Sequence, residues 1–422
     1  MLVSIKKWLW RFRRLGSLVL EAPRGARANI LRWNAIFLFN KICEKKTVLF
    51  ECQQPRDWGF LDSVYRALRE CSDIRCYVLV NDRPARIGGI GYDVDAVKTL
   101  LKSAGVDMSH VAQRLKSALF FADFYLTPTT YNNFLPVDRT IARGVMPHGL
   151  VNKRYPISSG FDQSPNQYGP EMSEFDVLLS TGPECTRTAN TFRSIYGHKY
   201  VIWEVGYPKI DNLLTTQGAA HSQFSGQPLH VIYAPSWGKH TALDVYGLSP
   251  VQWAHDAGHS VTIKLHPMSL SSHNDLATGG VDWCKAIEPY RNLERVKVID
   301  TAANDDVLRN ADVMISDVSG IAYEFILMEK PVIFLDLPGF FHCGADIEGV
   351  DGIGDLSFWG RSYGRIVSNR EEMLAAMDDY IHGRWMTDAV KELKRRLLFN
   401  PGCAGQAAAS TIMEFCQKRR NQ

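Results

Sequence analysis

The chain has 422 residues, 45% hydrophobic and 22% charged, which is ordinary for a globular protein with a large core and leaves room for more than one domain. Its nine cysteines form no CxxC pair and no Cys/His cluster at zinc spacing, so we expect reduced thiols in a cytosolic compartment and no disulfide framework. The net charge is +3, but residues 1–34 hold eight Lys or Arg and a single Glu. The remaining chain is slightly acidic, which makes nucleic acid a poor candidate partner.

The basic N-terminal segment predicts a helix that lies on a membrane surface. At helical spacing over residues 2–18, one face of the helix is basic and the opposite face is apolar. The basic face consists of Lys6, Lys7, Arg11, Arg13 and Arg14. The apolar face consists of Ile5, Trp8, Leu9, Phe12 and Leu15. Basic amphipathic helices with aromatic residues bind anionic membranes, whereas this segment is too charged to span one and has no signal-peptide core. The alternative is a helix packed on the protein with its basic face in water.

Short apolar runs then alternate with helical patterns, which predicts βα units and parallel sheets. Strands are expected at 46–52, 75–80, 119–127, 140–146, 176–181 and 199–205, and in the second half at 230–236, 260–267, 295–300, 312–317 and 330–336. Helices are expected at 62–71, 304–311 and 320–329. The polar stretch 211–228 reads as a linker, so we expect α/β domains at 44–210 and 228–385, followed by C-terminal helices at 386–422.

Ligands of open parallel sheets bind where strands end, so the residues after each strand are the first candidates. The strand at 140–146 runs into Pro147, His148 and Gly149. Histidine can act as a general base near neutral pH, and glycine lets the backbone approach a ligand closely. An ordinary loop histidine beside a turn glycine explains the same letters equally well.

The strand at 260–267 carries Lys264 and His266 on one face, just before a proline that ends it. Two donors on one face at a strand end suit a phosphate. The alternative is a surface lysine and a capping histidine.

The junction ISDVSG, residues 315–320, joins a buried strand to a helix. An ordinary N-cap needs one small polar residue, yet Ser316, Asp317 and Ser319 precede Gly320. Free N–H groups at a helix start bind anions, which predicts a phosphate site. Glu324 lies one turn further and could hold ribose hydroxyls of a nucleotide, or it could simply be a solvated helix residue.

In this order the motifs FEC, PHGL, VGYPKIDNLL, YAPSW, IKLHP, SDVSGIAYEF and FNPG resemble the CDP-glycerol glycerophosphotransferase family of teichoic-acid and capsule polymerases and primases. The resemblance implies a GT-B fold, in which two Rossmann-like domains face a central cleft. It implies catalytic roles for His148 and His266, and donor binding by the serines of SDVSG. It adds Gly149, Lys209, Pro235 and Ser236 as further cleft candidates.

The resemblance also implies a reaction. An acceptor hydroxyl on a lipid-linked or polymeric glycan would lose its proton to His148 and attack the β-phosphorus of CDP-glycerol or another CDP-alditol, releasing CMP. His266, Lys264 and the 315–320 junction would hold the phosphates, with Asp317, Gly320 and Glu324 lining the donor site. No metal site is evident, although a divalent cation fits the chemistry, and the expected place is the cytoplasmic face of a bacterial plasma membrane. Alternatives are a UDP-sugar glycosyltransferase or epimerase of the same fold, and a nucleotide-binding regulatory module without turnover.

Overall fold

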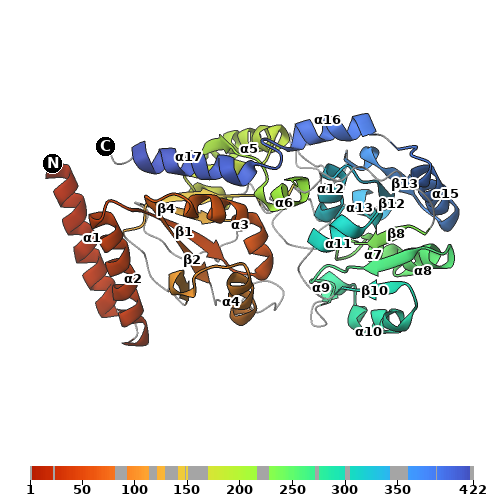
Figure 1. The fold of residues 1–422 in the computed structure, drawn as a ribbon, viewed down its shortest axis with the longest axis horizontal. Helices are drawn as coiled ribbons and strands as arrows, with labels where there is room; N and C mark the ends of the chain where they lie inside the picture. The colour runs from red at the N-terminus through yellow and green to blue at the C-terminus, as the bar shows by residue number, and fades with distance from the viewer. Residues whose placement is uncertain are drawn as a thin grey trace.

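The computed structural model describes residues 2–21, 24–80, 93–113, 121–128, 141–147, 149–150, 170–215, 228–270, 275–299, 305–342, 360–385 and 387–418. Two parallel β-sheets lie side by side, each with helices on its faces (Figure 1). We call the part built on the first sheet the N-terminal lobe and the part built on the second the C-terminal lobe. The expected GT-B architecture is confirmed.

The N-terminal lobe contains seven parallel strands in the order β3-β2-β1-β4-β5-β6-β7. The strands are β1 (Lys46–Cys52), β2 (Ile74–Val80), β3 (Val111–Gln113), β4 (Phe124–Thr127), β5 (Ala142–Val145), β6 (Val177–Ser180) and β7 (Val201–Glu204). The main helices are α3 (Pro55–Arg69), α4 (Val94–Ser103) and α5 (Pro183–Tyr196). The strand order reverses between β1 and β4, which creates the crevice where such sheets bind ligands.

The C-terminal lobe repeats this arrangement with six parallel strands in the order β10-β9-β8-β11-β12-β13. The strands are β8 (His230–Tyr233), β9 (Ser260–Ile263), β10 (Val296–Val298), β11 (Val313–Ser316), β12 (Val332–Leu335) and β13 (Arg365–Val367). The helices are α7 (Ala242–Tyr246), α8 (Ser249–Asp256), α9 (Asp275–Thr278), α10 (Trp283–Ile287), α11 (Asp305–Asn310), α12 (Gly320–Leu327), α13 (Pro338–His342) and α15 (Arg370–Ile381). Here the order reverses between β8 and β11.

The lobes share one buried apolar cluster, so they are not joined by a linker alone. Tyr207, Ile232 and Met314 all belong to this cluster, although they come from opposite sides of the boundary. Part of the stretch expected to be an irregular linker is helical, as α6 (Asp211–Thr215), and it follows the short 3-10 turn η3 (Pro208–Ile210). Residues 216–227 lie outside the described part of the chain.

The C-terminal helices run back across both lobes (Figure 1). Helix α16 (Thr387–Leu397) pairs through Arg396 with Glu184 of the N-terminal lobe at 2.6 Å and through Lys394 with Glu329 of the C-terminal lobe at 3.1 Å. Helix α17 (Ala404–Lys418) then packs on α3. The carboxylate of Asp211 accepts hydrogen bonds from the first two backbone N–H groups of α17, at 3.0 and 2.7 Å. The described part of region 386–422, where C-terminal helices are expected, contains these two helices, and they fasten the lobes together.

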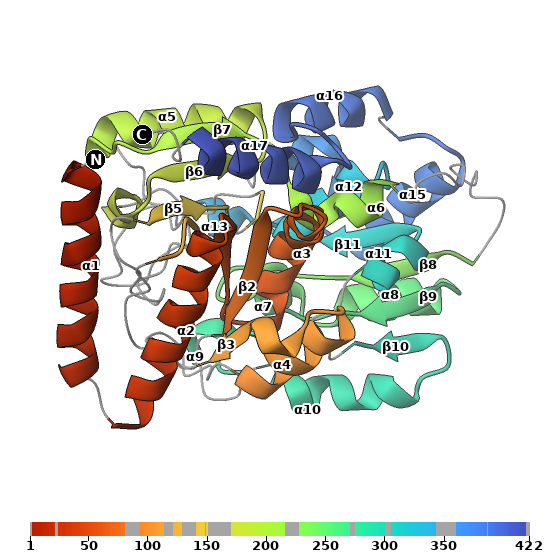
Figure 2. The same ribbon diagram turned by 60° about the vertical axis from the view of Figure 1, so that its left-hand side comes forward.

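Two N-terminal helices, α1 (Leu2–Glu21) and α2 (Arg24–Ile42), form a hairpin at one end of the molecule (Figure 2). Helix α2 buries Trp33 and Phe37 against the first sheet. Leu15 and Leu18 of α1 also pack against this cluster, and the ring of Phe12 lies 5.4 Å from that of Phe121. The apolar face predicted for the N-terminal segment is therefore divided, because part of it contacts the protein.

Candidate active site

The C-terminal ends of β8, β9 and β11 meet at one edge of the second sheet, and most predicted donor-site residues lie there. Lys264 and His266 follow β9, Pro235 and Ser236 follow β8, and the junction of residues 315–320 lies at the end of β11. Because the strands are parallel neighbours, residues distant in sequence come together at the point where the strand order reverses.

Asp317 joins two of these strand ends. Its carboxylate is fully buried and accepts hydrogen bonds from the backbone N–H of Ser236 at 2.9 Å and of Ala242 at 2.9 Å. The first bond fixes the loop after β8, and the second satisfies a donor at the start of α7. The observed contacts of Asp317 therefore shape the site, whereas its predicted contact with the donor remains a prediction.

The two serines of the junction occupy different environments. Ser316 is buried, and its hydroxyl donates to the carbonyl of Ala234 at 2.6 Å. Ser319 is the N-cap of α12, yet its side chain makes no capping hydrogen bond. A Cβ added at Gly320 would meet no atom of the described residues within 4 Å. The first turn of α12 therefore has both a hydroxyl that is not used as a cap and room for a ligand, as an anion site requires.

Lys264 is a buried cation at this edge. Only 8% of its surface is exposed. Burial, together with the charge of Lys209, lowers the pKa of its ammonium from 10.5 to about 8, against the opposing effect of Glu324. An ammonium group desolvated in this way gains more than a solvated one from a bound phosphate. A buried ammonium group of this kind is therefore suited to binding a phosphate.

Glu324 lies on α12, as predicted, but it is buried and faces the N-terminal lobe. One carboxylate oxygen accepts hydrogen bonds from the Tyr207 hydroxyl at 3.0 Å and from the Lys209 ammonium at 2.5 Å. The Lys209 ammonium also lies 5.2 Å from the centre of the Phe60 ring. These contacts tie the two lobes together beside Lys264. The predicted ribose contact stays a prediction, and the solvated alternative is wrong because Glu324 is only 3% exposed.

His266 lies partly exposed in the turn after β9. The backbone N–H of Met268 donates to its Nδ1 atom at 3.1 Å, and the Trp237 ring lies 6.0 Å away, centre to centre. Both contacts fix the orientation of the imidazole ring.

The corresponding edge of the first sheet holds the PHG motif. Gly149 has φ +109°, a conformation that favours glycine, and its N–H bonds to the Pro147 carbonyl at 3.0 Å. His148 lies outside the described residues, so its predicted role as general base stays a prediction.

Sequence reasoning did not single out three side chains that matter here. Tyr207 and Trp237 lie inside motifs that were noted, but their contacts reach residues 117 and 29 positions away. Glu51, within the FEC motif, is buried at the end of β1 and accepts a hydrogen bond from Tyr125 on β4. A carboxylate inside an apolar strand is the signal that could have identified Glu51, because such burial requires a partner.

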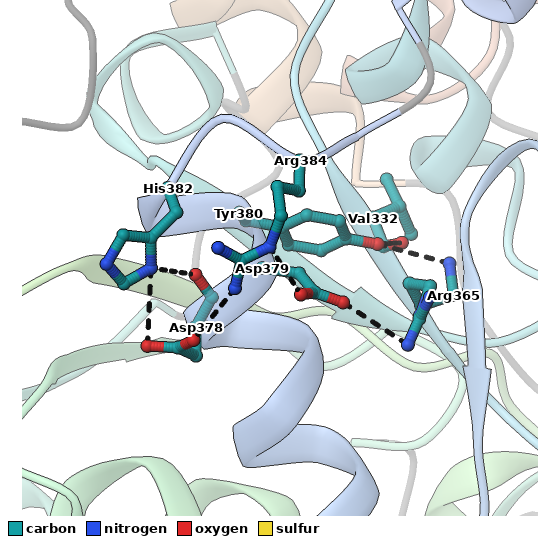
Figure 3. Close-up of polar contacts among 7 residues, drawn as sticks. All are labelled: Val332, Arg365, Asp378, Asp379, Tyr380, His382 and Arg384. Carbon is teal, nitrogen blue, oxygen red and sulfur yellow. Dashed lines mark hydrogen bonds and ion pairs between the residues drawn. The ribbon is translucent and has the colours of Figure 1, made fainter.

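A second polar cluster lies away from this edge (Figure 3). The Tyr380 hydroxyl donates to the carbonyl of Val332 at 3.0 Å and accepts from the N–H of Arg365 at 3.1 Å, and these are the first residues of β12 and β13. Asp379 pairs with Arg384 at 2.9 Å and with Arg365 at 3.3 Å. The cluster holds α15 against the N-terminal ends of these strands, opposite to the ligand edge.

Residues 148–337 match the model of the family described as CDP-Glycerol:Poly(glycerophosphate) glycerophosphotransferase. The matched region begins at His148 and ends after β12, so it includes every predicted donor-site residue. The match covers a little under half of the chain, and this part of the chain is similar to that family. A search of curated protein sequences found no match.

Solved structures support the GT-B fold of this chain. A histidine variant of the wall teichoic acid polymerase TagF matches with a TM-score of 0.59 and 15% identity over 100% of both chains. A TagF variant soaked with CDPG for 30 minutes matches with a TM-score of 0.57 and 14% identity over 99% of both chains. A putative UDP-N-acetylglucosamine 2-epimerase from Listeria monocytogenes has a TM-score of 0.58 and 13% identity, over 90% of this chain and 97% of its own.

Two further properties concern the described residues alone. Among them, no helix is both long enough and apolar enough to cross a membrane. Within the same residues, no group of three or more His, Cys, Asp or Glu side chains is arranged to hold a metal ion.

Proposed function

We propose that this protein transfers glycerol phosphate, or a related alditol phosphate, from a CDP-alditol to a hydroxyl group of a cell-surface glycan or lipid-linked acceptor and releases CMP. The observation that carries the proposal is that the matched region, residues 148–337, contains the C-terminal ends of β8, β9 and β11, where the predicted donor-site residues lie. This edge offers a buried ammonium and an open helix start, which are the groups that a donor pyrophosphate needs.

In the proposed reaction the donor pyrophosphate lies at the start of α12, near Ser319 and Gly320, with Lys264 beside it. The acceptor hydroxyl loses its proton to His148 and attacks the β-phosphorus in line with the leaving CMP. A new P–O bond to the acceptor forms as the bond between the β-phosphorus and the bridging oxygen of CMP breaks. Phosphoryl transfer depends mainly on positioning and charge stabilisation, and these groups can supply both.

Glu324 and Lys209 would link donor binding to the position of the lobes. Lys209 belongs to the segment after β7. Its ammonium forms an ion pair with the carboxylate of Glu324 on α12, next to Lys264. A donor phosphate that attracts both ammonium groups would strengthen the contact between the lobes. We expect this contact to define the closed form of the cleft.

The test is an incubation of the purified protein with separate donors and a candidate glycan acceptor. With CDP-glycerol or CDP-ribitol, CMP should be released, and the acceptor should gain the mass of one alditol phosphate. UDP-N-acetylglucosamine is tested as a further donor, because a putative epimerase of that sugar nucleotide has a similar fold. Release of UDP, or epimerisation without release of CMP, would refute the proposed transfer.

We also propose that α1 and α2 attach the protein to an anionic membrane surface, which places it on the cytoplasmic face of the bacterial plasma membrane. Leu31, Ala35, Phe39 and Ile42 of α2 recur at helical spacing and are exposed. On α1, Leu9 is 64% exposed, next to basic residues. Burial of these side chains in lipid contributes about 1.5–3 kcal/mol for each large apolar residue.

Vesicle sedimentation tests the membrane contact. The variant with Leu31→Ser, Phe39→Ser and Ile42→Ser should remain in the supernatant with phosphatidylglycerol vesicles, whereas the wild type should sediment. Val281→Ser is the control, because this exposed valine lies on the other lobe. Substitution is preferable to deletion because α2 also buries Trp33 and Phe37. Equal sedimentation of the triple variant and the wild type would contradict the proposed surface.

A further inference from the structure

The turn after β9 folds the imidazole of His266 back onto its own backbone. The N–H of Met268 donates to Nδ1 of His266 at 3.1 Å, and the N–H of Ser269 donates to the His266 carbonyl at 2.9 Å. Pro267 keeps His266 out of the helical conformation. Ser269 is almost fully buried, which anchors the turn. The ring is thus fixed by backbone groups that cannot change their protonation.

These contacts determine which ring nitrogen carries the proton. A backbone N–H can only donate, so Nδ1 of His266 must accept through its lone pair. The proton of the neutral imidazole is therefore on Nε2, which becomes a hydrogen-bond donor. A second proton on Nδ1 would point at the Met268 N–H, which is itself a donor.

Trp237 restricts the same ring from the neighbouring strand. Its ring centre lies 6.0 Å from that of His266 with an angle of 36° between the planes, and it follows β8 rather than β9. The loop that carries Trp237 is itself fixed, because Asp317 accepts the N–H of Ser236 at 2.9 Å. Rotation of the imidazole would have to displace the indole as well as break the bond to Met268.

We infer that Trp237 is a positioning residue for His266, and that His266 acts as a neutral hydrogen-bond donor through Nε2–H. Its ligand is an oxygen of the phosphoryl group that is transferred, so this inference rests on the proposed function. His266 neither gains nor loses a proton during the reaction. Lys264 supplies the positive charge at this edge, and His266 orients the phosphoryl group through a directional hydrogen bond.

The first experiment measures the tautomer and needs no substrate. In protein labelled with ¹⁵N-histidine, long-range ¹H–¹⁵N correlation spectra identify the protonated nitrogen of each ring, and His266→Gln assigns the signal. His266 should carry its proton on Nε2 near neutral pH. Trp237→Leu should give a mixture of tautomers, and Trp237→Phe should restore the single form. A proton on Nδ1 in the wild type, or an imidazolium, would overturn the inference. An unchanged signal in Trp237→Leu would overturn the role of Trp237.

The second experiment measures release of CMP from CDP-glycerol. Glutamine can place a neutral N–H near the position of Nε2, whereas alanine cannot. We therefore expect His266→Gln to lower kcat by about 10-fold or less and His266→Ala to lower it about 100- to 1000-fold, as for loss of one donor to a developing oxyanion. Trp237→Leu should lower kcat about 10-fold with little change in KM, and Trp237→Phe should recover most of it. Equal losses of kcat in His266→Gln and His266→Ala would show that proton transfer or charge is needed, and they would overturn the neutral role of His266. If the wild type releases no CMP, the proposed function fails, while the tautomer experiment still decides the state of His266.

Discussion

Replacing Lys264 with methionine should make the protein more stable and its donor binding weaker. Lys264 is the buried cation of the candidate site, and burial makes its charge costly. Methionine has a similar length and no charge, so it keeps most of the packing. A residue that destabilises the ligand-free protein but binds the ligand is typical of a functional site.

The size of the effect follows from the pKa of Lys264. Burial and the charge of Lys209 lower this pKa from 10.5 to about 8, which corresponds to about 3 kcal/mol in favour of the neutral amine. The native protein therefore binds this proton more weakly than the unfolded chain does. The free energy of unfolding should rise with pH between about 8 and 10.5, and the destabilisation should be fully present below about pH 8. At about pH 7, Lys264→Met should gain up to about 3 kcal/mol.

Urea denaturation at about pH 7 and about pH 9.5 measures this gain, which should shrink at the higher pH. Lys391→Met is the matched control, because Lys391 is 61% exposed and should change stability by less than about 0.5 kcal/mol. Donor affinity should fall about 10- to 100-fold at about pH 7, since a charge-assisted hydrogen bond contributes about 1.5–3 kcal/mol. A Lys264→Met variant that is less stable than the wild type by more than about 1 kcal/mol at that pH would show that the ammonium is well compensated, and the reasoning would fail.

Other substitutions test the framework of the site. Asp317→Ala removes the acceptor of two backbone N–H groups, so it should lower the free energy of unfolding by about 2–6 kcal/mol in urea denaturation. Asp317→Asn should lower it less, because its amide oxygen still accepts a hydrogen bond. Equal losses in the two variants would contradict this role of Asp317. Gly182→Ala should lower the melting temperature by several degrees, because its Cβ would lie 2.1 Å from the Leu397 backbone carbonyl. Gly320→Ala is the control and should be tolerated. Equal melting temperatures of the two variants would refute the close contact at Gly182. Lys209→Met should cost about 3–5 kcal/mol by leaving the buried Glu324 carboxylate without its ion pair, and adding Glu324→Gln should recover part of that loss; no recovery would show that Lys209 acts mainly through packing.

The strands that cross the core could be predicted because each is a short apolar run between polar segments. All eleven predicted strands overlap an observed one. Within the described part of the chain, the strands that were not predicted are β3 and β13, which are edge strands of three residues each. Ile366 in the middle of β13 is 48% exposed, so no apolar pattern marks it. Edge strands are defined by the neighbour with which they pair, and that information lies elsewhere in the chain.

The candidate site was predictable to the level of which strand ends it uses. Parallel strands bring their C-terminal ends to one edge, so Lys264, His266 and the junction after β11 could be assigned to one place from order alone. Their partners could not be assigned in this way. Lys209 and Glu324 are 115 residues apart, and the sequence around one of them does not indicate that the other is its partner. The same limit applies to the contact between Trp237 and His266.

Asp317 and Ser319 illustrate why residue type does not separate framework from ligand site. Both are strong N-cap types within the junction of residues 315–320. In the folded chain the Asp317 carboxylate is fully buried and accepts two backbone N–H groups, while the Ser319 hydroxyl makes no cap bond at the open start of α12. The buried carboxylate therefore keeps the loops in place, and its negative charge is directed at backbone donors. The beginning of α12 can then present N–H groups, a hydroxyl and the nearby Lys264 to a doubly charged pyrophosphate.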